Sequence, residues 1–498
     1  MRSDYAKKNI FWAIIQQIVS ICFGILIPSL IISKYGSNTY GLITSITSFL
    51  SYITLLESGI GAVFRAEIMK PICDNDREKT INVIVAAQSF FKKIGIIFVI
   101  YVFALCFVYP MIINDQFDSI FTILLIVILS IGMFIEYYYA LVYKFYLQTK
   151  QKSYIVSLFS SLTIFLTSSI TIVLVLMNQN IIIVKLIAAI TSLLLPFLMI
   201  LYIRKKEKID IKECTRKEKL NGKWDGLAQH IALVVNNNTD VVVLTLFSTL
   251  KNVSVYSIYY LIVSNIRNIV ISFTSGIDVS FGDMYLKKEY DTLKRSFNLY
   301  EIIYFTMTTI LFICTFFLIL PFIKVYTLNL TDAYYINETF GYLFVLAYFV
   351  YCIRMPYYSL SLIVGHFKET RNGAFLEAGL NIFISTVLVI RYGLVGVAIG
   401  TLVAMLVRTI ELIIHCYRKI LDIPLKNLIF KIIVIVLEFV CIYILINNII
   451  TFETINYIGW FIYAIKVFLI VIIVVFIGNL LAYRNHINSI FNLLKNKK

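Results

Sequence analysis

The sequence predicts an all-α, polytopic membrane protein of about fourteen transmembrane helices. Apolar runs of helix length recur from Ile10 to Leu481. Hydrophobic residues make up 60% of the 498 residues and charged residues only 14%, which is more apolar surface than a water-soluble fold can bury. The runs are continuous and lack the period-two alternation of a transmembrane barrel. We therefore expect the chain to cross the membrane as helices.

At about 20 apolar residues per crossing, the runs divide into six spans before the central polar interval, six after it and two at the end. We expect them at residues 10–32, 41–64, 94–112, 119–142, 154–177, 181–203, 225–248, 255–277, 299–322, 340–364, 372–390, 394–417, 428–450 and 457–482. The first run follows Arg2, Lys7 and Lys8, as the apolar part of a secretory signal would. It is too long, contains Gln16 and Gln17 and lacks an A-x-A cleavage site, so we expect an uncleaved span.

The formal net charge of +16 does not require a nucleic-acid partner, and we expect none. Basic residues of a polytopic protein collect in cytoplasmic loops because of how its helices insert. With the N-terminus inside, most of the 44 lysines and arginines fall on the inner side. An even number of spans then places both termini in the cytoplasm. The polar interval from Arg204 to Lys223 is expected to be a basic cytoplasmic linker.

The eight cysteines are dispersed along the chain. They form neither a disulfide framework nor a CxxC metal spacing. We expect no metal and no cofactor.

A weak internal repeat predicts two related bundles. The stretch from Leu174 to Lys205 aligns without gaps with Leu388 to Lys419 and ends on the same basic pair. Each half then holds six spans in the same orientation, as in parallel transporter repeats. The expected organisation is an N-terminal lobe at 1–208, a linker at 209–224, a C-terminal lobe at 225–420 and two additional helices with a tail at 421–498.

Arg267 and Arg354 lie near the centres of the eighth and tenth expected spans, where neither can easily reach an interface. An inward-facing guanidinium offers bidentate donors to a phosphate or pyrophosphate and stays charged at any working pH. The alternative is a structural ion pair, for example Arg267 with Asp240 or Arg354 with Glu377. Both interpretations stay open at this point.

Asp240 ends a polar run, Asn236 to Thr239, within the seventh expected span. A carboxylate there, beside Asn237, is a candidate site for a coupling proton or sodium ion in a cavity. The alternative is that the polar run forms hydrogen bonds with neighbouring helices.

Other intramembrane charges favour simple pairing. Arg408 and Glu411 are spaced i, i+3, so they share a helix face and can pair, although Arg408 remains a candidate substrate cation. Glu438 and Lys466 fall in the two additional spans, where we expect them to pair with each other rather than to lie on a transport path.

Two stretches resemble a known family. The segments Lys34-Tyr35-Gly36, Tyr40-Gly41 and Glu57-Ser58-Gly59-Ile60-Gly61 leading to Arg65 are similar to the early signature of Wzx-type lipid-linked oligosaccharide flippases. Leu380-Asn381 and the segment Tyr392-Gly393-Leu394-Val395-Gly396-Val397-Ala398-Ile399-Gly400-Thr401 look like that family's eleventh-to-twelfth span region. Its glycines predict a tight turn followed by a small-residue face for close helix contact. Glu57 stands where the family more usually has aspartate.

The resemblance implies membership of the multidrug/oligosaccharidyl-lipid/polysaccharide (MOP) exporter superfamily, with two MATE-like six-helix lobes around a cavity. It implies a flippase, not an enzyme, that moves an undecaprenyl-pyrophosphate-linked repeat unit of O-antigen, capsule or another surface polysaccharide across the bacterial cell membrane. Expected partners are that lipid-linked substrate, bilayer lipids and other polysaccharide-assembly membrane proteins. Candidate substrate-binding residues are Arg267, Arg354, Arg65 and Arg408, and candidate ion or cavity residues are Asp240, Glu57 and Asn237.

Two other functions compete with the flippase. A MATE-type exporter of drugs or cations would place carboxylates rather than arginines at mid-membrane, because its substrates are cations. A membrane-bound polysaccharide polymerase or glycosyltransferase would display a long outer loop with catalytic groups, and the longest outer connection, Tyr326 to Phe340, is short. For the flippase, a proton gradient, a sodium gradient or the membrane potential is expected to set the direction of transport.

Overall fold

The computed structural model describes residues 2–57, 60–113, 116–209, 227–273, 278–450, 452 and 455–484. Within these ranges the chain is helical and contains no strand, so the all-α prediction is confirmed. The chain divides into two compact units, Met1–Ser254 and Val255–Lys498. Residues 210–226, which hold nearly all of the predicted linker, lie outside the described residues.

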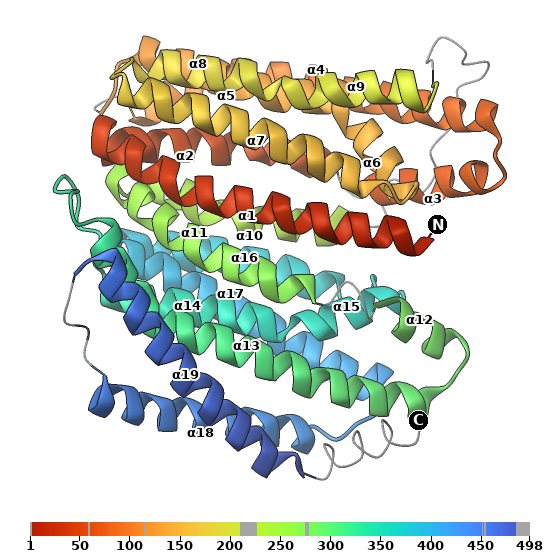
Figure 1. Ribbon diagram of the computed structural model, residues 1–498, viewed down its shortest axis with the longest axis vertical. Helices are drawn as coiled ribbons and strands as arrows, with labels where there is room; N and C mark the ends of the chain where they lie inside the picture. Colours follow the sequence, from red (N-terminus) through yellow and green to blue (C-terminus); the bar gives the residue numbers. More distant parts are fainter. Residues whose placement is uncertain are drawn as a thin grey trace. The chain divides into compact units, whose positions relative to one another are not determined.

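The first unit is a bundle of long helices with short connections (Figure 1). Helix α1 packs against α7, α4 against α5, α5 against α8, and α2 against α10. A core rich in aromatic rings, including Phe64, Phe91 and Phe98, fills the space between α3, α4 and α6. The elements are α1 (Arg2–Tyr35), α2 (Ser37–Ser51), η1 (Tyr52–Glu57), α3 (Ile60–Cys73), α4 (Arg77–Ile113), α5 (Ser119–Ile135), η2 (Glu136–Ala140), α6 (Leu141–Thr149), α7 (Ser153–Leu176), α8 (Ile181–Ser192), α9 (Leu194–Lys206) and α10 (Leu227–Phe247).

Local residues explain where these helices begin and end. Gly36, with φ 85°, separates α1 from α2 in a backbone conformation that a side chain would strain. Asp118 and Asn180 cap α5 and α8, because each side chain accepts hydrogen bonds from the first free backbone N–H groups of its helix. Gly41 lets α2 approach the chain at Leu250, whose carbonyl oxygen lies 1.9 Å from the position of an added Cβ.

The second unit is built around α16 and α17, which pack along their length, with α14 against α17 and α13 against α14. Gly393, with φ 54°, forms the expected tight turn between α16 and α17. A Cβ at Gly396 would lie 2.3 Å from the Leu388 carbonyl oxygen, so the predicted close helix contact is confirmed. The elements are α11 (Leu250–Ser272), most of which belongs to this unit, α12 (Asp278–Leu286), α13 (Tyr290–Tyr326), α14 (Glu338–Ile353), α15 (Met355–Ile363), α16 (Arg371–Tyr392), α17 (Leu394–His415), η4 (Cys416–Ile420), α18 (Lys426–Ile449) and α19 (Tyr457–Ala482).

Twelve helices in the described part of the chain are long and apolar enough to cross a membrane. Two more helices, α10 and α11, are also long enough to cross a membrane, at 1.5 Å of helix rise per residue. Polar residues lower their hydropathy. Together they occupy the places of the predicted spans. The chain is therefore a multi-pass membrane protein.

Three predicted spans have different limits in the structure. The second, expected at 41–64, begins at Ser37, tightens from the α-helix α2 into the 3-10 helix η1 at Tyr52, and ends at Glu57. The third and ninth belong to α4 and α13, which are 37 residues long and begin well before the apolar run. Hydropathy marks only the part of a helix that is apolar on all sides, so it misses such amphipathic extensions.

The two additional helices pack against α13 and each other (Figure 1). Their shared core is a separate apolar cluster that includes Ile442, Ile446 and Val471. The predicted pair of helices after the second lobe is therefore attached to that lobe through α13.

Candidate substrate and ion sites

Three tyrosine rings surround the guanidinium of Arg267 on α11. Its central carbon lies 6.0 Å from the ring centroid of Tyr260, 5.7 Å from Tyr348 and 5.6 Å from Tyr351. Tyr260 lies seven residues before Arg267 on the same helix face, and Tyr348 and Tyr351 are one turn apart on α14. The negative faces of the rings stabilise a cation in this half-buried position. The predicted central arginine is thus held in an aromatic cage.

Tyr351 also connects Arg267 with Arg354, whose guanidinium lies 4.3 Å from the same ring centroid. Arg354 donates from Nη1 to Glu377 Oε1 at 2.5 Å, and both side chains are buried. This is the ion pair that the sequence left open as the alternative to a ligand role. Asp240, the pairing alternative for Arg267, belongs to the first unit.

Glu377 also faces a second arginine, Arg408, whose Nε lies 3.8 Å from Glu377 Oε2. Arg408 donates from Nη1 to Glu411 Oε2 at 2.5 Å and to the Thr370 carbonyl at 2.8 Å, so the i, i+3 pair exists. We call Arg354, Glu377, Arg408 and Glu411 the ion network. Two positive and two negative groups make it neutral, which offsets the cost of burying each charge.

Gly373 on α16 provides the room for the end of this network. A Cβ added there would lie 1.7 Å from Glu411 Oε2. The carboxylate therefore occupies the space that any side chain at position 373 would need.

A second buried polar cluster, which the sequence did not predict, surrounds Glu301 on α13. Its carboxylate accepts hydrogen bonds from the Tyr357 hydroxyl, from Tyr417 at 2.9 Å and from Lys431 Nζ at 2.7 Å. Lys431, on α18, also donates to Asn298 Oδ1 at 2.6 Å. The three groups that donate to Glu301 belong to other helical elements, α15, η4 and α18, and Lys431 lies 130 residues further along the chain. The pair attaches α18 to the rest of the unit.

In the first unit, Asp240 is almost fully buried, with 1% of its surface exposed. The neighbouring Thr239 hydroxyl lies 3.4 Å from the Tyr52 hydroxyl, and Tyr52 is within electrostatic range of the Asp240 carboxylate. Asn237 is half-buried, and Asn238 donates to the Val234 carbonyl of its own helix. Thr239 and Asp240, at the end of the predicted polar run, are therefore buried.

Glu57 and Arg65 lie at the junction of η1 and α3. Glu57 accepts a hydrogen bond from the Tyr137 hydroxyl at 3.3 Å. Arg65 is exposed, donates to Gln148 Oε1 at 3.2 Å and lies 5.1 Å from the Phe145 ring centroid. The arginine that resembles the family signature therefore lies on the surface of the structure.

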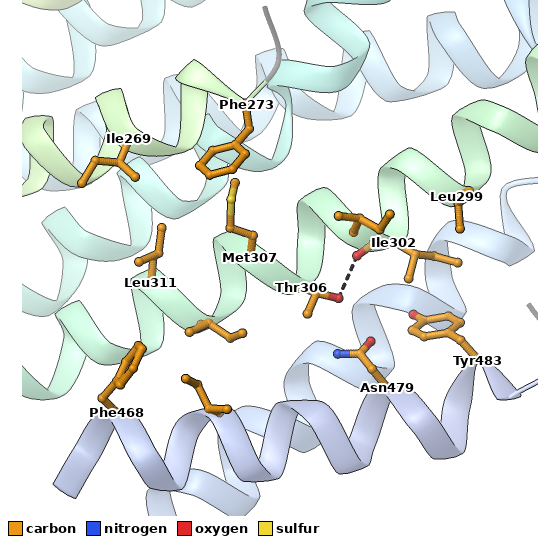
Figure 2. A pocket seen from close by; sticks show the side chains of 13 residues that line it. Ile269, Phe273, Leu299, Ile302, Thr306, Met307, Leu311, Phe468, Asn479 and Tyr483 are labelled. Atoms are coloured by element: carbon orange, nitrogen blue, oxygen red, sulfur yellow. Dashed lines mark hydrogen bonds between the residues drawn. The ribbon is translucent and has the colours of Figure 1, made fainter. Parts of the chain in front are cut away.

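An open apolar pocket of about 590 Å³ lies between α11, α13 and α19 (Figure 2). Apolar side chains such as Phe273, Met307 and Phe468 line most of it. Thr306 and Asn479 donate hydrogen bonds to backbone carbonyl groups of their own helices, at 2.8 and 2.9 Å. Figure 2 shows Asn479 and Tyr483 together at one end, so the other walls offer almost purely apolar contact.

Several solved structures with a similar fold are titled as a flippase or as MATE transporters. A structure titled "Lipid II flippase MurJ, inward closed conformation" has a TM-score of 0.69 and 16% identity, covering 96% of this chain and 100% of that one. An inward-facing multidrug resistance MATE family transporter of the MOP superfamily has a TM-score of 0.64 and 14% identity, covering 82% and 98%. This chain has the MOP-superfamily fold. The Vibrio cholerae MATE transporter VcmN in its bent form shares that fold at a TM-score of 0.53 and 14% identity, covering 84% and 98%.

The sequence itself matches no protein-family model and no curated protein. The predicted MOP-superfamily fold is confirmed by structure alone. Two features of the site could not be predicted from the sequence. The Glu301 cluster joins residues that are distant in the sequence, and two of the three tyrosines around Arg267 belong to another helix, α14.

Proposed function

We propose that this protein is a flippase that moves an undecaprenyl-pyrophosphate-linked oligosaccharide from the inner to the outer leaflet of a bacterial cell membrane. Both termini lie in the cytoplasm, and the two units open alternately to either side. The substrate is a repeat unit of O-antigen, capsule or another surface polysaccharide, and other polysaccharide-assembly membrane proteins are its partners. The MurJ structure, titled as a lipid II flippase, supports this class of substrate.

One observation carries the proposal: the same helix, α11, carries a caged cation and forms one wall of an apolar groove. Arg267 lies two residues before Ile269, so the two side chains leave opposite sides of α11, Arg267 toward the tyrosines of α14 and Ile269 into the open pocket. A lipid-linked pyrophosphate has an anionic group joined to a long isoprenoid chain, so it needs both kinds of contact. In our proposal the pocket holds part of the isoprenoid chain while Arg267 binds the pyrophosphate.

Among the four predicted substrate cations, the contacts favour Arg267 and Arg65 for direct binding. Arg354 and Arg408 are held in the ion network by carboxylates. We propose that these two position Tyr351 and, through it, the Arg267 guanidinium. Arg65, exposed at the junction of η1 and α3, binds the anionic headgroup as it enters from the cytoplasm.

Directional transport needs an energy source. We propose that a coupling proton or sodium ion binds at Asp240, near Asn237, with Glu57 in the same unit. The membrane potential can also drive a charged substrate, at about 2.3 kcal/mol per elementary charge per 100 mV.

The test is transport of a fluorescent undecaprenyl-pyrophosphate oligosaccharide in proteoliposomes, with surface polysaccharide measured in cells. Arg267→Ala should lose most transport. Arg267→Lys should keep part of it, because lysine retains the positive charge but lacks the planar, bidentate guanidinium. Arg391, exposed at the end of α16 and 5.8 Å from the Tyr392 ring centroid, supplies the matched control Arg391→Ala. Full transport by Arg267→Ala at normal protein levels would remove Arg267 from the mechanism.

A MATE-type cation exporter is the second candidate, and the buried Asp240 favours it, since a cationic drug seeks a carboxylate. The MATE structures share the fold. Resistance of an expressing strain to cationic drugs, lost in Asp240→Asn, would support export. The flippase proposal predicts unchanged drug resistance and a change in surface polysaccharide.

A further inference from the structure

The two additional helices pack through a regular apolar seam. Ile442 and Ile446 on α18 are four residues apart and almost fully buried. They face Val467, Val471 and Val475, which repeat at the same spacing on α19. This is the pattern of two helices joined along one face.

Glu438 continues this seam in a position where an apolar residue is expected. It lies four residues before Ile442 on the same face of α18, and only 5% of its surface is exposed. Gly478 of α19 makes room for it, because an added Cβ there would lie 2.7 Å from Glu438 Oε1. Helix α19 therefore leaves room for a carboxyl group where the seam continues beyond Ile442 and Val475.

Glu438 Oε1 is buried and has no hydrogen-bond partner within the described part of the chain. The predicted ion pair with Lys466 is wrong, since Lys466 is exposed and no such contact occurs among the described residues. Hydropathy could not distinguish a paired from an unpaired Glu438. Whether the two side chains meet depends on the direction in which each leaves its helix.

Glu301 provides the contrast in the same unit. Its carboxylate accepts hydrogen bonds from two tyrosines and from the Lys431 ammonium, which stabilise its negative charge. In the ranges that the structure describes, Glu438 has none of these donors. An unpartnered carboxyl in an apolar seam is far more stable as the neutral acid than as the carboxylate.

Among the described residues, Tyr483, directly after α19, lies close enough to interact electrostatically with the carboxyls of both Glu438 and Glu301 on α13. Lys431 lies two turns before Glu438 on α18. Burial raises the pKa of the Tyr483 phenol, and the nearby Glu438 and Glu301 carboxyls raise it further. Lys431 is already bound to Glu301 at 2.7 Å. The surrounding groups therefore do not supply a free cation for an ionised Glu438.

We propose that Glu438 is a proton-binding site within the membrane, occupied when α19 is packed over it and emptied when the seam between α18 and α19 opens to water. On release the carboxyl O–H bond breaks and the proton passes to a water molecule, leaving the carboxylate solvated. On closure the reverse step returns the neutral acid. Proton occupancy is thus linked to the packing of the two helices.

This link reaches the apolar pocket, because the same helix lines it. Asn479, which follows Gly478, and Phe468 both belong to the pocket wall. A movement of α19 that exposes Glu438 also reshapes this wall. The inference goes beyond the proposed function, since the site and its tests do not depend on which molecule the pocket holds.

The first test uses dicyclohexylcarbodiimide, an apolar reagent that modifies protonated carboxyl groups in membranes. The purified full-length protein in lipid vesicles is treated between about pH 6 and 9 and mapped by peptide mass spectrometry. Glu438 should be modified, more slowly as the pH rises, while the paired Glu301 should remain unmodified. Glu438→Gln should abolish this modification. Modification of Glu301 in preference to Glu438, or a rate at Glu438 independent of pH, would overturn the proposal.

The second test does not require the reagent to reach the seam. Melting temperatures of the wild type and Glu438→Gln are compared over the same pH range in the same detergent. Glutamine is a neutral isostere of the protonated acid, so the variant should fold and lack the titration. The wild type should lose stability relative to the variant as the pH rises and the buried acid must ionise. Parallel melting curves at every pH would refute the assignment.

Discussion

Replacing Arg354 or Glu377 singly should destabilise the protein far more than replacing both. Their side chains meet at 2.5 Å, and each is buried. Removing one partner leaves the other as an uncompensated buried charge, at a cost of about 3–5 kcal/mol. The double variant Arg354→Met/Glu377→Met keeps similar volume and restores neutrality, so its change in unfolding free energy should be near zero.

The two single variants should differ from each other. In Arg354→Met, Glu377 keeps Arg408 at 3.8 Å, which partly stabilises its charge, so the cost should be about 3 kcal/mol. In Glu377→Met, Arg354 is left against the Tyr351 ring at 4.3 Å, and a cation–π contact offsets only about 2 kcal/mol of desolvation. The cost should then approach about 5 kcal/mol.

The assay is reversible unfolding by SDS in mixed micelles, analysed as a double-mutant cycle. We expect a coupling energy above about 3 kcal/mol, the upper end for ordinary neighbouring contacts. Glu411→Gln is the control, because the Glu411 side chain is 33% exposed and solvent screening limits its loss to about 1 kcal/mol. If the change in unfolding free energy of the double variant equalled the sum of the two single changes, the assignment of a buried, mutually neutralising pair would be refuted.

Two further predictions concern a glycine and a carboxylate outside the spans. Gly373→Ala should cost about 1–3 kcal/mol, because its Cβ overlaps the Glu411 carboxylate, whereas Gly379→Ala, with nothing within 4 Å, should be neutral or slightly stabilising in the same SDS assay. Burial raises the pKa of Glu207, but hydrogen bonds from Lys150 and Lys152 more than offset this and hold it below the usual value. Stability from this group is therefore present above about pH 4.3, its unfolded pKa, and is lost as the pH falls through the lowered folded value. Melting curves of Glu207→Gln should lack that acid transition; an identical transition in the variant would contradict it.

The sequence was sufficient for features that depend on local chemistry. Apolar runs located the spans, and glycine spacing predicted the turn at Gly393. The Arg408–Glu411 pair followed from helical periodicity alone, since residues three apart share a face. These predictions need no knowledge of which helices become neighbours.

Features that depend on helix neighbours were not predictable in the same way. The Arg354–Glu377 pair could be offered only as one of two alternatives, because its members lie on different helices. The Glu301–Lys431 pair was missed, since the two residues lie 130 positions apart in the sequence and nothing local marks Lys431 as a partner of α13. The end of the second span at Glu57 was also missed, because the following residues stay apolar after the helix changes geometry.

The buried charges of the second unit fall into two chemically different classes. In the ion network and in the Glu301 cluster, each carboxylate meets cations or hydroxyl donors, so ionisation is stabilised and the helices that supply the donors are held together. At Glu438 the helix pair α18–α19 instead closes over a carboxyl that meets no such donor among the described residues. Paired charges resist separation of their helices, whereas an unpaired acid lets its helices separate whenever water can take the proton. In our proposal, α18 is therefore held to α13 by paired charges, whereas the packing of α19 on α18 responds to protons.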